Sequence, residues 1–169
     1  MTDSIDQRFH RNLRTMLVRP QSAYSWALAV WIVFLVSAMG LGALREGWIA
    51  PALGEQAAHV IGTLLFVTTM LAIMWPFVAK FRTTLLPRDL WLIGVMWTLM
   101  TLSFEFLFFH FVAGVPLETM LAEYNLFAGR LWVLVLLTTL FGPPLIGWGQ
   151  RSARNATASN QRSTIFDPW

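Results

Sequence analysis

One stretch decides the fold class of this chain, Ala23–Leu44, which reads AYSWALAVWIVFLVSAMGLGAL and holds no charged residue. A helix rises ~1.5 Å per residue, so the stretch is long enough to cross the ~30 Å hydrocarbon core of a bilayer. It follows a long polar segment and exceeds the apolar region of a cleaved signal peptide, which favours a signal anchor. The sequence therefore predicts an integral membrane protein.

Three further apolar stretches of similar length follow, at about 57–79, 90–115 and 126–148. None has the alternating pattern of a barrel strand, and an isolated strand in lipid leaves its backbone groups unpaired. We therefore expect an all-α integral membrane bundle of four transmembrane helices, running up-down-up-down. This transmembrane domain occupies residues 23–148.

Two polar segments flank the predicted spans. Segment 1–22 has the spacing of a capping box at Ser4–Gln7, followed by an apolar stripe opposite three arginines. This pattern favours an amphipathic helix on the cytoplasmic membrane surface, and an ordinary basic flank is the alternative. Segment 149–169 is rich in Ser, Thr, Asn, Gln and Arg, so we expect a disordered cytoplasmic tail.

The composition agrees with a membrane protein and excludes several other classes. Apolar residues make up 56% of the chain and charged residues 12%, against about 25% charged in an ordinary soluble domain. There is no cysteine, which excludes disulfide scaffolds and thiolate metal sites. The basic residues flank the spans instead of clustering on one face of a soluble domain, so no nucleic acid partner is expected.

The positions of the basic residues predict the orientation. Of 12 Lys and Arg residues, all but Arg45 and Arg130 lie before the first span, between the second and third, or after the fourth. Basic residues are enriched on the cytoplasmic side, so both termini are predicted to be cytoplasmic in a bacterial inner membrane. Trp48 and Trp132 fall near the predicted outer interface. Four tryptophans fall near the inner one, namely Trp26, Trp75, Trp91 and Trp148.

Motifs of common enzymes are absent from the sequence. It contains no GxxxxGK[ST], GxGxxG, HExxH or GxSxG pattern, and the predicted loops leave no room for a soluble catalytic domain. Any function must therefore use the spans and the two outer loops.

Two ionisable residues lie within the predicted spans at some depth. Glu105 shares a helical face with Thr98 and Thr101, which indicates that it faces the bundle. Arg130 enters the fourth span from its outer end, and the hairpin brings it towards Glu105. We predict a buried ion pair between Glu105 and Arg130, with a proton- or substrate-binding carboxylate as the alternative.

Histidines near the outer ends of the spans are candidates for a metal or cofactor site. His59 and His110 lie near the outer ends of the second and third spans, and Glu55 shares a helical face with His59. Two facing histidines can hold a haem iron, and histidines with carboxylates can hold a divalent metal. No CxxCH or HExxH motif supports either, so we expect no metal and no cofactor, with haem b or a divalent metal as the alternative.

The remaining polar side chains gather at the predicted outer ends of the helices. Residues 116–125 resemble a short interfacial helix, which either covers a cavity or simply connects two spans. Pro143 and Pro144 are expected to bend or end the fourth helix. The full outer polar cluster is Arg45, Glu46, Glu55, His59, His110, Glu118, Glu123, Tyr124 and Asn125.

Several strings resemble a known group of proteins. They are Gly42–Glu46, Glu105–Phe106 followed by His110 and Gly114, and Leu121–Leu126 with Gly129–Trp132. These strings look like a family of small four-helix proteobacterial inner-membrane proteins with no established activity. The similarity covers roughly residues 37–147, and it implies a bacterial inner-membrane setting but no reaction.

Three classes of function remain open from the sequence. The leading one is a non-enzymatic accessory or self-assembling membrane protein, with the lipid bilayer as its partner and either copies of itself or a larger membrane complex as the protein partners to be tested. The second is a small oligomeric transporter or channel that uses Glu105 and Arg130. The third is a haem- or metal-binding redox protein that uses His59 and His110.

Overall fold

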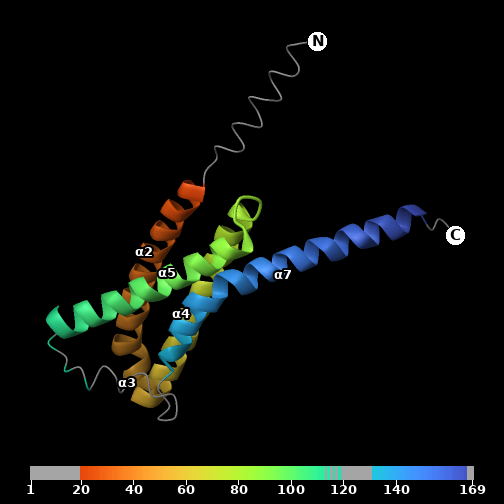
Figure 1. The fold of residues 1–169 in the computed structure, drawn as a ribbon. Coiled ribbons are helices and arrows are strands. Elements are labelled where there is room, and N and C mark those ends of the chain that lie inside the picture. Colours follow the sequence, from red (N-terminus) through yellow and green to blue (C-terminus); the bar gives the residue numbers. More distant parts are fainter. Residues whose placement is uncertain (1–19, 113, 115, 117, 119–130, 167–169) are drawn as a thin grey trace.

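The structure is a computed structural model that describes residues 20–112, 114, 116, 118 and 131–166. The amphipathic helix predicted before Pro20 and most of the connector predicted at 116–125 lie outside these residues. Figure 1 shows the helical elements, which are α2 (Pro20–Leu44), the π-helix η1 (Arg45–Ile49), α3 (Ala50–Leu53), α4 (Glu55–Phe81), α5 (Pro87–Glu105), the π-helix η2 (Phe106–Val112) and α7 (Val133–Phe166).

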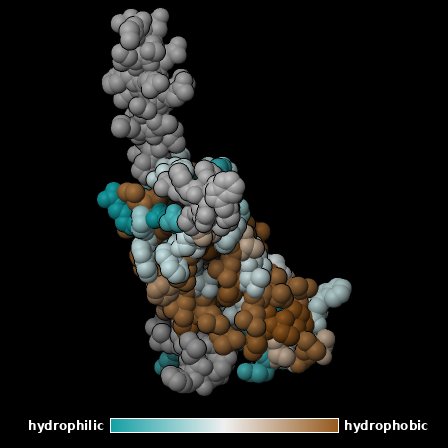
Figure 2. Space-filling model, turned by 90° about the vertical axis from the view of Figure 1, so that its right-hand side faces the viewer, coloured by the Kyte–Doolittle hydropathy of each residue, from teal (hydrophilic) through white to brown (hydrophobic). Residues whose placement is uncertain are grey.

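The structure confirms an all-α fold with four helical segments of the length and apolar composition that a membrane span requires. Within the described chain, four helical segments are long and apolar enough to cross a membrane, namely Ser22–Leu53, Glu55–Phe81, Pro87–Val112 and Val133–Thr157. Many large apolar side chains on them are exposed to the surroundings, which suits contact with lipid chains. Figure 2 shows the resulting apolar surface, with hydrophilic residues towards its two edges.

The first span is longer than predicted, because the helix does not end at Leu44. Helix α2 continues through η1 and α3 to Leu53, and the chain turns at Gly54. Gly54 has φ +83° and ψ 160°, a conformation that is essentially restricted to glycine. Arg45 and Glu46, predicted to lie in an outer loop, therefore lie within a continuous helical rod.

The turn between α4 and α5 is defined by a proline and an aspartate. Pro87 occupies the first turn of α5, where its missing N–H costs no helical hydrogen bond. The carboxylate of Asp89 accepts a hydrogen bond from the Leu86 N–H at 2.8 Å, which satisfies a backbone donor at the helix start. Tyr24 of α2 also reaches Asp89, with its hydroxyl 3.5 Å from Oδ1. These contacts fix the start of α5 against α2.

Helix α7 passes through Pro143 and Pro144 without ending. The sequence predicts a bend or an end at these prolines, and Figure 1 shows α7 changing direction along its length while it remains helical. The helix continues to Phe166 and so covers most of the segment for which a disordered tail is predicted. Propagating an existing helix needs no new nucleus, so polar residues after the span can extend it.

The two prolines free two backbone carbonyls, and α5 packs against them. Proline at 143 and 144 removes the N–H groups that would bond the carbonyls of Thr139 and Leu140. A Cβ atom built on Gly94 of α5 would lie 2.3 Å from the Leu140 oxygen and 3.3 Å from the Thr139 oxygen. The glycine backbone thus fits where any side chain would collide. Close Cα–H···O contact of this kind partly compensates carbonyls that lack a helical donor.

Side-chain contacts define how the helices run past each other. Thr98 of α5 meets Thr139 of α7 at 3.0 Å, while Leu90, earlier in α5, lies against Gly147, later in α7, so these helices are antiparallel. Helix α4 also packs against α7, with Met74 beside Gly142 and Val78 beside Gly147. Helix α2 is the outermost, with 11% of its most apolar window buried against 33% for α4. The core between the helices includes Phe66, Met70, Met74, Phe77, Val78, Ile93, Trp97 and Val135.

Indole N–H groups attach α2 to α5. Trp97 is fully buried and donates to the Ala27 carbonyl at 2.8 Å, and Trp31 donates to the Thr101 hydroxyl at 3.1 Å. The ring of Phe34 packs edge-on against Trp97 at 5.1 Å between centroids. Because α2 buries little apolar area, these directed contacts set its position.

Candidate functional site

The two ends of the bundle differ in chemistry and are named here by their turns. The Gly54 end holds residues 45–55 and His59, and the Pro87 end holds residues 20–26, 80–90 and 148–157. The candidate site lies at the Gly54 end. It consists of Arg45, Glu46, His59 and Thr63, with Glu105 nearby and deeper.

Arg45 opens the π-helical segment η1 and is held on three sides. Its guanidinium forms an ion pair with the neighbouring Glu46 carboxylate. Its Nη1 lies 3.5 Å from Nδ1 of His59 on α4. Its aliphatic carbons lie over Gly62, where a Cβ atom would be 3.2 Å from the arginine Cδ. The absence of a side chain at Gly62 therefore lets the arginine stem lie flat between α2 and α4.

The contact with Arg45 determines which nitrogen of His59 carries a proton. A guanidinium has only donors, so Nδ1 of His59 must accept, and Nε2 carries the N–H. Both this Nε2 and the Nε of Arg45 are buried and have no hydrogen-bond partner within the described part of the chain. Two N–H donors thus remain available to an acceptor at this point between α2 and α4.

Thr63 and Phe66 link this cluster to a deeper one. The buried Thr63 hydroxyl donates to the His59 carbonyl at 2.9 Å, which satisfies it within α4. One turn below Gly62, about 6 Å along the helix at ~1.5 Å per residue, Phe66 stacks on the Trp132 ring. The Trp132 Nε1–H donates to Oε1 of Glu105 at 2.7 Å. The carboxylate therefore lies below the arginine–histidine pair.

Glu105 is 5% exposed at the last turn of α5, just before η2. A π-helical segment adds a residue to a turn and redirects the side chains around it, and such segments are frequent at functional sites. Here η1 begins at Arg45 and η2 begins directly after Glu105. Arg45 and Glu105, two of the polar residues of the candidate site, thus each lie at a change in helix type.

The predicted partner of Glu105 falls outside the described residues. Arg130 is not among them, so the ion pair between Glu105 and Arg130 stays a prediction. Trp132 was predicted to lie at the outer interface, but its indole hydrogen-bonds Glu105 inside the bundle. Sequence reasoning missed this role because an indole near a span end suits either an interface or a buried acceptor.

The structure does not bring the predicted metal candidates together among the residues it describes. His59 contacts Arg45, whereas the exposed His110 lies in η2 with its ring against Phe111. Glu55 is exposed at the start of α4. No group of three or more His, Asp or Glu side chains in this part of the chain could hold a metal ion.

Of the remaining members of the predicted outer cluster, two lie among the described residues and three do not. Glu118 is exposed and helical. Glu123, Tyr124 and Asn125 lie outside the described residues. Glu46 is exposed beside Arg45.

Comparison with known proteins adds no relative to this picture. No protein-family model, no curated protein and no solved structure matches the chain.

Proposed function

We propose that the protein is a non-enzymatic, multi-pass component of a bacterial inner membrane, an accessory or self-assembling protein that works through its Gly54 end. The packing of the bundle interior carries this proposal. Met70, Met74, Ile93 and Trp97 are each at most 1% exposed and fill the space between the helices. A conduit through one copy needs a polar path there, whereas the one N–H among these close-packed side chains, that of Trp97, is already bonded to the Ala27 carbonyl. A role in binding other membrane proteins therefore fits this interior better than a role in transporting a solute through the bundle.

Three of the less exposed acid and base groups of the described chain also fit a non-enzymatic role. Glu105 accepts from Trp132, Nδ1 of His59 faces Arg45, and Asp89 accepts from the Leu86 N–H. A general acid or base must lie within hydrogen-bond reach of a substrate proton. Glu105 and His59 instead contact residues of other elements, and Asp89 caps the start of α5.

Helix α2 is the element best suited to meet another membrane helix. It is the least buried of the four, and α2, η1 and α3 together carry Arg45 and Glu46 to the Gly54 end. Interhelical hydrogen bonds stabilise association in lipid, where apolar contact alone gives no advantage over lipid chains. The N–H groups of Arg45 and His59 that have no partner among the described residues are buried. They become donors for such a contact when the local packing rearranges.

The proposed orientation places both termini in the cytoplasm and the Gly54 end outside. Its support is the basic-residue count: Lys80, Arg82 and Arg88, together with Arg151 and Arg154, lie at the Pro87 end. A reporter active only in the periplasm should give a strong signal when fused near Gly54 and none when fused after Trp148. The reverse pattern would contradict the orientation.

The accessory role is tested by extracting the tagged full chain into polymer nanodiscs with its native lipid and measuring the mass of the particles. We expect a fixed multiple of the chain or one stoichiometric companion protein, which is lost in Arg45→Gln. Arg88→Gln removes the same charge from an exposed arginine at the other end and should keep the companion. A single copy with no companion contradicts the proposal.

A small transporter is the second candidate, favoured by the burial of the Glu105 carboxylate within a span. Proteoliposomes loaded with a pH-sensitive dye distinguish the two. We expect proton flux equal to that of protein-free liposomes. A flux that disappears in Glu105→Gln would establish the transporter instead.

A further inference from the structure

The Pro87 end has a strong excess of positive charge. Its described residues include five basic side chains, Lys80, Arg82, Arg88, Arg151 and Arg154, and a single acidic one, Asp89. Arg88 lies 3.8 Å from Asp89, so its charge is partly balanced, while the other four basic residues have no acidic partner among the described residues. An excess of this size attracts anions.

Two of these cations are fixed in place instead of extending freely from the surface. The Lys80 ammonium lies 3.7 Å from the centre of the Trp26 ring and 5.6 Å from that of Phe81. The Arg151 guanidinium donates to the Leu85 carbonyl at 3.0 Å through one N–H. Each cation therefore keeps further N–H donors for an anion. Its side chain is already ordered, so binding an anion costs less conformational entropy.

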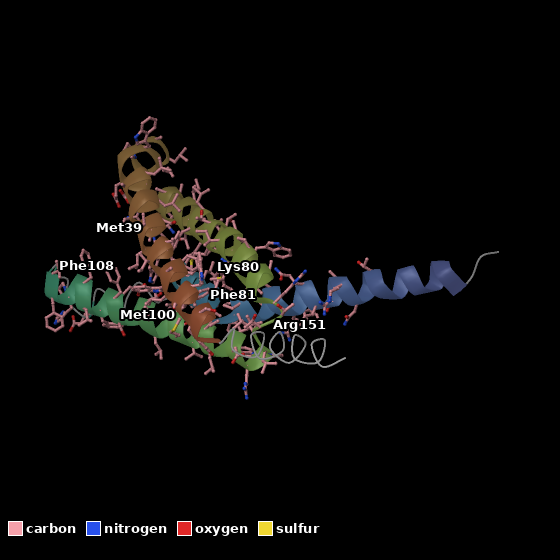
Figure 3. All side chains as sticks on the ribbon, turned by 90° about the horizontal axis from the view of Figure 1, so that it is seen from above. Met39, Lys80, Phe81, Met100, Phe108 and Arg151 are labelled. Carbon is pink, nitrogen blue, oxygen red and sulfur yellow. The ribbon has the colours of Figure 1, made fainter. Side chains whose placement is uncertain are left out.

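The two fixed cations flank the same turn. Phe81, which lies under Lys80, accepts the backbone bond of Leu85, and the Leu85 carbonyl accepts from Arg151. Figure 3 labels Lys80, Phe81 and Arg151, which lie where α4 ends beside α7. Arg154 follows one turn after Arg151 on the same helix. An anion placed over this turn meets donors from both helices.

Exposed tryptophans locate this turn at the level of lipid headgroups. Trp75 is 56% exposed on α4 and Trp148 is 71% exposed on α7, and each lies a few residues before one of the fixed cations. Indoles favour the interface between hydrocarbon and headgroups. Lys80 and Arg151 therefore follow at headgroup depth, with exposed apolar surface directly above them for acyl chains.

From this arrangement we infer that the turn at Phe81–Leu85 binds the phosphate of an anionic phospholipid through Lys80 and Arg151. Basic pockets between transmembrane helices are suited to such headgroups. The phosphate diester receives the free N–H donors of both side chains, and the acyl chains lie along α4 and α7 beside Trp75 and Trp148. A zwitterionic lipid brings its own cation and gains less from the same site.

Native mass spectrometry of the full chain released from detergent tests this inference. With phosphatidylglycerol and phosphatidylcholine supplied in equal amounts, we expect selective retention of phosphatidylglycerol. Lys80→Gln and Arg151→Gln should each reduce that retention about fivefold, the effect of removing one cation from an anionic lipid surface. Arg88→Gln, which removes the same charge from a residue paired with Asp89, should change it little.

Three results would overturn the inference. The first is equal retention of the two lipids by the unaltered chain, a measurement that does not depend on the folding of any variant. The second is equal loss in all three variants, which would indicate an unspecific charge effect. The third is displacement of phosphatidylglycerol by millimolar inorganic phosphate, which would assign the site to a free anion. Lys80→Arg and Arg151→Lys, which keep the charge, should retain the lipid.

Discussion

Helices α7 and α2 are both attached to the bundle, but by different means. Helix α7 meets its neighbours through glycines whose missing side chains allow close approach, at Gly142 and Gly147 on α7 itself and at Gly94 on α5. Helix α2 also carries glycines, yet a Cβ atom on Gly40 or Gly42 would meet nothing within 4 Å. It is attached by directed hydrogen bonds from indoles instead. The same residue type therefore serves packing in one helix and leaves an open face in the other.

The largest expected effect is that of Gly94→Ala. Its Cβ atom would lie 2.3 Å from the Leu140 oxygen, a backbone atom that cannot rotate away, so α5 and α7 must separate. We expect a loss of about 3 kcal/mol in the free energy of unfolding, at the upper end of the overpacking range. Reversible unfolding in mixed detergent micelles measures it. A loss below that of Gly147→Ala would show that the two helices do not depend on this contact.

The next effect tests the attachment of α2. Trp97→Phe keeps an aromatic ring but removes the donor to the Ala27 carbonyl, so α2 loses its only fully buried indole bond within the described chain. We expect a loss of about 1–2 kcal/mol, near the maximum measured for hydrogen bonds between membrane helices. If proteolysis of the variant in micelles leaves α2 as protected as before, the indole bond does not position this helix.

A smaller effect is expected for Gly147→Ala. The new Cβ atom would lie 2.3 Å from Cδ1 of Leu90, the end of a flexible side chain that can change rotamer. We expect a loss of about 1 kcal/mol, from an off-rotamer leucine and some overpacking. The matched comparison with Gly94→Ala separates collision with a side chain from collision with backbone.

The smallest effect is expected for Gly42→Ala on α2. Nothing lies within 4 Å of the new atom, and alanine is favoured over glycine in a helix by up to about 1 kcal/mol. The free energy of unfolding should stay unchanged or rise slightly in the isolated chain. If the nanodisc particles of this variant lose a companion while the isolated chain stays stable, α2 contacts that companion through Gly42.

The number and position of the spans could be predicted from apolar length, but their ends could not. The Arg45–Glu46 pair resembles the start of a loop in sequence, whereas the ion pair and the space over Gly62 let a charged pair remain in a helix. Likewise, Pro143 and Pro144 resemble a helix end in sequence. The contact that compensates the freed carbonyls comes from Gly94 on a different helix, so the local sequence does not reveal it. Both errors arise from tertiary contacts that a local pattern does not contain.

The ionisable members of the candidate site were predictable from the sequence, whereas the buried Thr63 and the contacts between the members were not. Glu105 and His59 stand out as ionisable residues in apolar stretches. Their observed partners are Trp132 and Arg45, which the sequence places at an interface and in a loop. Which polar residues meet depends on helix register, and one turn of difference selects another partner.

The continuous rod from Ser22 to Leu53 has a consequence for bilayer thickness. Its 32 residues measure about 48 Å at ~1.5 Å per residue, well beyond ~30 Å of hydrocarbon. A helix that is too long for its membrane tilts or thickens the lipid around it, and a thinner membrane demands more tilt. Because α2 is only lightly buried, its tilt is set as much by the lipid as by its neighbours. A thinner membrane therefore changes the tilt of this rod and, with it, the position of Arg45 relative to His59 of α4.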